Sequence, residues 1–200
     1  MDFVLEIPNN LSSEKCEQMI KRFEEDDRKR RGVTADFKPE PSAKRSTDLQ
    51  VSGLEGWKDI DEYLQKQLTK GVEKYREHLM KEVGSLDWLA FRLEDTGYQI
   101  QKTTKGEYYT WHTDGVMSEK RIFTFLWYLN DIDPIKDGGG TAFHPSIDGG
   151  KVVKPEQGKL LLFPASWTYL HMGLPLITDE KNKYICTGWI RSDDEFWPPG

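Results

Sequence analysis

Residues 106–114 read Gly-Glu-Tyr-Tyr-Thr-Trp-His-Thr-Asp, a β-prone run that ends in a histidine and an aspartate separated by one residue. In a β-strand, residues i and i+2 point to the same face, so the side chains of His112 and Asp114 converge on one point. A nitrogen and an oxygen ligand held in this way suit a divalent metal ion. The triplet alone is weak support, because such a pair also arises by chance.

Further short β-prone runs, separated by glycine, proline and aspartate, lie on both sides of this triplet. They are residues 88–93, 98–102, 108–112, 122–129, 141–143, 160–163, 168–171 and 184–190. Strands at this spacing without helices between them are typical of a sandwich or a jelly roll. We therefore expect a mainly β fold, with a double-stranded β-helix (jelly roll) as its core over residues 85–200.

Two amphipathic helices precede the strands. Ser12 can cap the first helix, and Gly32 supplies a stop. Its apolar positions are Cys16, Met19, Ile20 and Phe23. The second helix spans about residues 59–83, with one apolar stripe and a glycine after it. We expect both helices to pack on one sheet, with residues 1–84 forming helical support and a loop, in a single domain of 200 residues.

The segment Val33–Gly56 is polar and interrupted by proline and glycine. Only residues 48–52 can form a short strand within it. A long irregular segment in a compact domain is either mobile or a binding loop.

Composition excludes several classes of protein. The net charge is −6, with 28 basic and 34 acidic residues, which does not favour nucleic-acid binding. The two cysteines, Cys16 and Cys186, provide neither a disulfide framework nor a thiolate metal site. No apolar run approaches the ~20 residues that span a bilayer, and residues 1–8 lack the basic start of a signal peptide. We expect a cytoplasmic protein with no nucleic-acid or membrane partner.

A second histidine strengthens the metal hypothesis. His171 ends another strand-like run, and two imidazoles with one carboxylate form the facial triad of non-haem iron(II) oxygenases. Ligands without thiolate argue against structural zinc, and an all-oxygen calcium or magnesium site would not use two histidines. Catalytic zinc stays open on ligand type alone. The other two histidines are predicted to be a surface residue, His78, and a loop residue, His144.

The run that begins at Lys183 adds a buried cation. Period-two alternation places four residues on one side of this strand: Lys183, Ile185, Thr187 and Trp189. An inward-facing lysine is costly to bury without an anion. The carboxylate of a small dicarboxylic acid would meet that requirement.

Six motifs, in the same order, resemble the prolyl 4-hydroxylase-like branch of the 2-oxoglutarate and iron(II)-dependent oxygenases, over about residues 98–191. Residues 106–114 resemble the branch's Gly…Tyr-x-x-His-x-Asp, and residues 121–130 resemble its Arg-x-x-Thr…Tyr-Leu-Asn strand. The remaining matches are residues 138–143, 155–163 and 171–175, and the Lys-x5-Trp pair of Lys183 and Trp189.

The resemblance implies a role for each matched residue. It implies iron(II) ligation by His112, Asp114 and His171. Lys183 would pair with the far carboxylate of 2-oxoglutarate. The residues implied to line the cosubstrate pocket are Tyr128, Thr141 and Thr187, and those implied to contact substrate are Tyr109, Arg121 and Trp189. Dioxygen is the implied oxidant, and ascorbate is the candidate reductant.

Two departures from the branch bear on the cosubstrate. The branch often has a second tyrosine about nine residues before the proximal histidine, and this position holds Thr103 here. The interval from His171 to Lys183 is about two residues longer than usual, which leaves Lys181 as a rival for the carboxylate. The Lys-x5-Trp register favours Lys183.

The branch implies a peptide or protein substrate that contains proline, and Val33–Gly56 is a candidate loop to close over it. The alternative substrates are a free amino acid or another small molecule. A nucleobase demethylase is disfavoured by the net charge and by Trp189, where demethylases carry a second arginine. The alternatives from other classes are a zinc hydrolase and a non-catalytic sensor that binds metal or 2-oxoglutarate.

Overall fold

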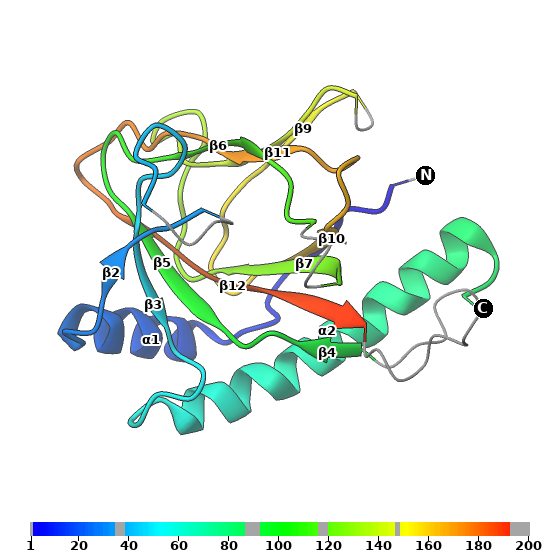
Figure 1. Cartoon of the computed structure of the whole chain (residues 1–200), viewed down its shortest axis with the longest axis horizontal. Helices are drawn as coiled ribbons and strands as arrows, with labels where there is room; N and C mark the ends of the chain where they lie inside the picture. The colour runs from blue at the N-terminus through cyan, green and yellow to red at the C-terminus, as the bar shows by residue number, and fades with distance from the viewer. Residues whose placement is uncertain (1, 35–38, 87–92, 116–119, 147–148, 193–200) are drawn as a thin grey trace.

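The computed structural model describes residues 2–34, 39–86, 93–115, 120–146 and 149–192. Two antiparallel sheets face each other, and two helices cover the larger one (Figure 1). The larger sheet contains, in spatial order, β1 (Leu5–Ile7), β10 (Leu160–Pro164), β7 (Arg121–Tyr128), β12 (Lys183–Ser192), β5 (Gln99–Thr103), β3 (Thr47–Gln50) and β2 (Arg30–Arg31), and β4 (Leu93–Asp95) pairs with β12. The smaller sheet contains β6 (Tyr109–His112), β11 (His171–Gly173), β8 (Thr141–Phe143) and β9 (Lys151–Val153). The predicted mainly β jelly roll with flanking helices is confirmed.

The two helices form where the apolar patterns predict them. Helix α1 (Ser13–Glu25) begins with the Ser12 hydroxyl accepting a hydrogen bond from the backbone N–H of Lys15 at 3.3 Å. It ends at Asp26 and does not reach the predicted stop at Gly32, because the chain turns there to join the larger sheet as β2. Helix α2 (Lys58–Val83) ends at Gly84, whose φ of 76° is a left-handed conformation that favours glycine.

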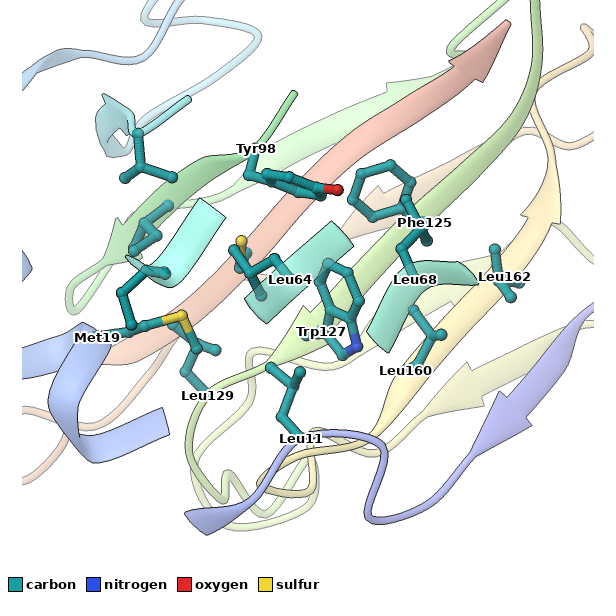
Figure 2. Packing of buried hydrophobic residues seen from close by; sticks show 14 of the residues in the cluster. Leu11, Met19, Leu64, Leu68, Tyr98, Phe125, Trp127, Leu129, Leu160 and Leu162 are labelled. Carbon is teal, nitrogen blue, oxygen red and sulfur yellow. The ribbon is translucent and has the colours of Figure 1, made fainter. Parts of the chain in front are cut away.

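The main hydrophobic core lies between these helices and the larger sheet. Leu64 and Leu68 of α2 point toward Trp127 on the sheet, and Met19 of α1 approaches the same layer (Figure 2). All four side chains are buried, and each fully buried leucine stabilises the fold by about 1.5–3 kcal/mol. This packing fixes the larger sheet, so its opposite face is a rigid wall for the space between the sheets.

Two connections close the seams between the sheets. Residues 43–50, which we call the strap, run along both sheets: Arg45 donates its backbone N–H to the Tyr108 oxygen at 2.8 Å, and residues 47–50 form β3 beside β5. At the other seam, the Glu6 carboxylate of β1 accepts from Lys151 of β9 at 2.9 Å and from Lys159 at 2.8 Å. The two sheets are therefore joined at both seams, by the strap at β6 and by Glu6 at β9.

The structure differs from the sequence prediction at several short elements. Strands β1, β2 and β9 were not predicted, and the N-terminal 84 residues contribute β1, β2 and β3 to the larger sheet in addition to helical support. The predicted strand at residues 168–171 is shifted, because β11 begins only at His171. Residues 88–92 of another predicted strand lie outside the described residues. In the described part of the chain, neither helix is long and apolar enough to cross a bilayer.

Candidate active site

The metal-binding residues predicted from the sequence meet between the two sheets. His112 at the end of β6 and His171 at the start of β11 are register partners across the smaller sheet, and Asp114 follows β6 by two residues. Their candidate ligand atoms all lie within 4.8 Å of one another. The Asp114 carboxylate is 3.7 Å from Nε2 of His112 and 3.4 Å from Nε2 of His171. Among the described residues, no other group of three or more such side chains could hold a metal ion.

Hydrogen bonds orient each member of this triad. Nδ1 of His112 lies 2.7 Å from the Thr110 oxygen, and Nδ1 of His171 lies 2.9 Å from the Tyr169 oxygen. Because a carbonyl can only accept, Nδ1 carries the proton in the neutral form of each ring, which leaves Nε2 with a lone pair directed at the centre. The Thr124 hydroxyl donates to the Asp114 carboxylate at 2.7 Å. The three donor atoms are therefore positioned before any ion binds.

Burial and mutual charge shift the pKa values of the triad. Burial lowers the pKa of His112 to about 4, and the neighbouring His171 acts in the same direction. Burial also opposes the charged form of His171, but the Asp114 carboxylate outweighs it and raises the pKa of His171 above its ordinary value. For Asp114, burial alone would raise the pKa, yet His171 and His112 hold it well below its usual range. The site thus contains a carboxylate and at least one neutral imidazole at neutral pH.

Lys183 lies in the same cavity at the start of β12. Its side chain is buried, and its ammonium group donates to the Gly139 oxygen at 2.6 Å. Burial lowers the pKa of Lys183 to about 8. The rival Lys181 is half exposed and lies 3.5 Å from the Asp137 carboxylate, outside the cavity. The structure therefore brings Lys183 to the cavity and leaves Lys181 at the surface.

A cavity of about 280 Å³ connects the triad, Lys183 and most of the other predicted site residues. Those that line it are Thr103, Tyr109, Arg121, Thr141, Thr187 and Trp189. Alternation along β12 is confirmed, because Ile185 also lines the wall. Tyr128 does not line it: its buried hydroxyl instead donates to Thr141 at 2.7 Å. Thr103 lies opposite Lys183 in the register of β5 and β12.

Several cavity residues were missed by sequence reasoning. The strap contributes Lys44, Arg45, Ser46 and Gln50, and the neighbouring strand β5 contributes Gln99 and Gln101. Period-two spacing of Gln99 and Gln101 in a predicted strand was a usable signal. The strap gave no such signal, because its position depends on pairing with distant strands. The predicted loop at residues 33–56 is thus partly built into the sheet edges.

The remaining histidines and cysteines lie outside the triad. His78 is on α2, and His144 follows β8, where its Nδ1 lies 2.9 Å from the Ser146 hydroxyl. Cys16 and Cys186 are both buried and free, as expected for a chain without a disulfide framework.

Comparison with known proteins places the site in a family context. A sequence profile described as the 2OG-Fe(II) oxygenase superfamily matches residues 98–191. A PKHD-type hydroxylase of Synechococcus sp. (strain CC9902) is 28% identical over 95 residues. That match covers 46% of this chain and 40% of the relative, so the chain spans well under two thirds of the length of the curated relative.

Solved structures share the fold at low sequence identity. A prolyl hydroxylase of Trichoplax adhaerens, in complex with a fragment of the hypoxia inducible factor oxygen degradation domain, has a TM-score of 0.77 at 19% identity, covering 98% of this chain and 86% of its own. A Pseudomonas putida prolyl-4-hydroxylase has a TM-score of 0.69 at 17% identity, covering 96% and 94%. HygX from Streptomyces hygroscopicus, with nickel, 2-oxoglutarate and hygromycin B bound, has a TM-score of 0.65 at 12% identity, covering 96% and 84%.

Proposed function

Because this chain belongs to the 2OG-Fe(II) oxygenase superfamily, we propose that it is a 2-oxoglutarate- and iron(II)-dependent dioxygenase that hydroxylates a C–H bond of a peptidyl proline. One observation carries the proposal. The His112–Asp114–His171 triad and the buried ammonium group of Lys183 share one cavity. A metal site that binds no acidic cosubstrate would not need the buried ammonium group of Lys183.

The donor set fits iron(II). Two imidazole nitrogens and one carboxylate oxygen are the ligands of non-haem iron(II) oxygenases, and this set leaves coordination positions open. His112, Asp114 and His171 would hold the ion. Bound iron(II) would supply the redox chemistry that joins dioxygen, 2-oxoglutarate and substrate.

The surroundings of Lys183 fit a dicarboxylic acid. Within the described residues its ammonium group has a single hydrogen-bond partner, the Gly139 oxygen, and no carboxylate pairs with it. A buried ammonium group without a counter-charge is costly. The far carboxylate of 2-oxoglutarate would supply that charge. The hydroxyl of Thr141, which accepts from Tyr128, keeps its own proton and would add a hydrogen bond to that carboxylate. The hydroxyl of Thr187 donates to the Phe125 oxygen at 2.7 Å, so Thr187 would shape the wall of the pocket.

The outer part of the cavity would bind the substrate. The guanidinium group of Arg121 lies over the Trp189 ring, 3.4 Å from its centroid, and Tyr109 lies beside His112. These three side chains would orient the target carbon and exclude water from it. Two structures with the same fold are prolyl hydroxylases, which supports a proline-containing peptide.

A small polar molecule is the second candidate substrate. Glutamine and threonine side chains line much of the wall, and HygX, which shares the fold, contains hygromycin B. Assaying the purified protein with proline-containing peptides and with free amino acids separates the two. The measured quantities are succinate release and a mass gain of one oxygen atom.

Substitution of a triad residue tests the assignment. We expect His112→Ala to abolish succinate release and to weaken Mn(II) binding, whereas His144→Ala retains both. Normal turnover of iron-supplemented His112→Ala would refute the assignment of His112 as a ligand.

A non-catalytic sensor would bind metal and 2-oxoglutarate without forming succinate, and the activity of a zinc hydrolase would not depend on 2-oxoglutarate. Stimulation of turnover by added ascorbate tests the predicted reductant.

A further inference from the structure

Arg45 is an exposed residue at the outer wall of the cavity. Its backbone N–H bonds to the Tyr108 oxygen, and its side-chain Nε donates to the Pro41 oxygen at 3.0 Å. The guanidinium group also lies over the Tyr108 ring, 5.6 Å from the centroid. These contacts use one of the five N–H donors of the side chain and fix the direction of the others.

No carboxylate of the described residues pairs with this guanidinium group. Acidic residues outnumber basic ones, 34 to 28, and four described arginines form ion pairs: Arg22, Arg28, Arg31 and Arg191. Arg45 forms no ion pair with any described residue. No ion pair of Arg30 or Arg76 is found among the described residues either, but Arg30 lies on β2 and Arg76 on α2, and neither lines the cavity. The charge of Arg45 therefore remains available at the mouth of the site.

The balance of charge along the cavity wall is positive. Besides Arg45, the described lining residues include the cationic side chains of Lys44, Arg121 and Lys183, and among them Asp114 is the single acidic side chain. Lys44 is balanced by the Asp48 carboxylate at 2.7 Å, Lys183 has its proposed role with the cosubstrate, and Asp114 belongs to the triad. At the outer wall, Arg45 contributes positive charge to a protein whose net charge is −6.

We propose that Arg45 recognises a carboxylate of the substrate. This inference rests on the proposed hydroxylase function and narrows its substrate class to acidic molecules. The carboxylate belongs either to an aspartate or glutamate close to the target proline in a peptide, or to the α-carboxylate of a free amino acid. A planar guanidinium fork matches a carboxylate in two parallel hydrogen bonds, and its planarity limits the entropy lost per hydrogen bond.

Binding without turnover tests the proposal. The protein, loaded with Mn(II) and 2-oxoglutarate under nitrogen, is titrated with end-blocked peptides whose central proline is flanked by Asp, Asn or Lys. L-proline and L-prolinamide form the second arm. The variants are Arg45→Gln and Arg45→Glu, with Arg76→Gln as the matched control, and thermal unfolding verifies that each is folded.

We expect the dissociation constant to be about tenfold lower for the Asp peptide than for the Asn peptide, or for L-proline than for its amide, as one partly desolvated charge pair provides. The first result identifies an acidic side chain as the source of the carboxylate, and the second identifies an α-carboxylate. Arg45→Gln should remove the difference, Arg45→Glu should make the Lys peptide the tightest ligand in the peptide arm, and Arg76→Gln should change nothing.

Equal affinities across each arm, a ranking that survives Arg45→Glu, or no binding of any probe would overturn the proposal. A parallel assay in air scores the hydroxylase function separately. Charge-dependent binding without succinate or an oxygenated product would leave the role of Arg45 intact and contradict the proposed reaction. Hydroxylation without any charge preference in binding would support the proposed reaction and contradict the role of Arg45.

Discussion

The ring of Tyr109 lies parallel to the imidazole of His112, with the ring centroids 3.4 Å apart and an interplanar angle of 15°. The ammonium group of Lys44 lies over the same tyrosine ring, 5.4 Å from its centroid, and pairs with the Asp48 carboxylate at 2.7 Å. Both members of this ion pair belong to the strap and are buried. A candidate metal ligand is thus packed against a ring that the strap holds in place.

Lys44→Met should strongly destabilise the protein, because the Asp48 carboxylate would remain buried with only the Ser46 hydroxyl, 2.7 Å away, as a described side-chain partner. Removing one partner of a buried ion pair typically costs about 3–5 kcal/mol in the free energy of unfolding. Urea unfolding of the metal-free protein measures the change. Lys44→Met/Asp48→Leu should recover most of it, since no unpaired charge remains. Equal losses in the single and double variants would contradict the assignment of the effect to charge burial.

The affinity for 2-oxoglutarate should fall as the pH rises above about 8. Burial lowers the pKa of Lys183 to about 8, so the ammonium form that attracts a carboxylate predominates below that pH and is lost above it. Bound diacid favours the charged form, so the affinity should drop up to about tenfold per pH unit in this range. Titration of the Mn(II)-loaded protein from pH 6.5 to 9.5 measures it.

Lys183→Arg is the matched control for this pH dependence, because a guanidinium group keeps its charge throughout the range. Its affinity should be weaker but independent of pH. If the wild-type profile were as flat as that of Lys183→Arg, the ammonium group of Lys183 would not be the partner of the diacid.

Local patterns were sufficient to predict much of the site. The alternation of β12 placed Lys183, Ile185, Thr187 and Trp189 on one wall, and all four line the cavity, because side-chain direction in a strand follows directly from residue parity. The convergence of His112 with Asp114 follows from the same rule.

Other features depend on pairing between distant segments and have no local signature. The strap follows the edge of β6 and then of β5, about 60 residues further along the chain, so neither its path nor the burial of Lys44 follows from residues 43–50 alone. Strands β1 and β9 are three residues long, too short for a recognisable alternation.

Glu6→Gln should lower the free energy of unfolding by about 1–2 kcal/mol at pH 7, since it weakens two charge-assisted hydrogen bonds. One of them, from Lys151, closes the seam between β1 and β9, and the other comes from Lys159, just before β10. Burial raises the pKa of Glu6, but Lys159 and Lys151 outweigh it and lower the pKa below its ordinary value of 4.5. The stabilisation is therefore fully present above that value and is lost as the pH falls through the folded-state pKa.

Urea unfolding at pH 7 and pH 3 measures the loss, and the difference between wild type and Glu6→Gln should shrink at the lower pH. Glu180→Gln is the control, because its ion pair with Lys136 is exposed on both sides and should contribute little. A difference that persists unchanged at pH 3 would contradict an ionic origin.

Gly71→Ala should destabilise the protein even though alanine favours a helix. Gly71 lies in the middle of α2 and is buried against β10, where an added Cβ would clash with Cδ2 of Leu160. Helix propensity would contribute about 1 kcal/mol in favour of alanine, whereas overpacking a filled core costs about 1–3 kcal/mol. We expect overpacking to prevail, because Leu160 is itself fully buried and cannot move into solvent.

Thermal unfolding measures the effect of Gly71→Ala. Gly71→Ala/Leu160→Val should be more stable than Leu160→Val, because the shorter valine makes room for the added methyl group. Lys70→Ala, at an exposed neighbouring position, should stay within about 0.5 kcal/mol of wild type. A stabilising Gly71→Ala would show that α2 can shift away from the sheet at this point.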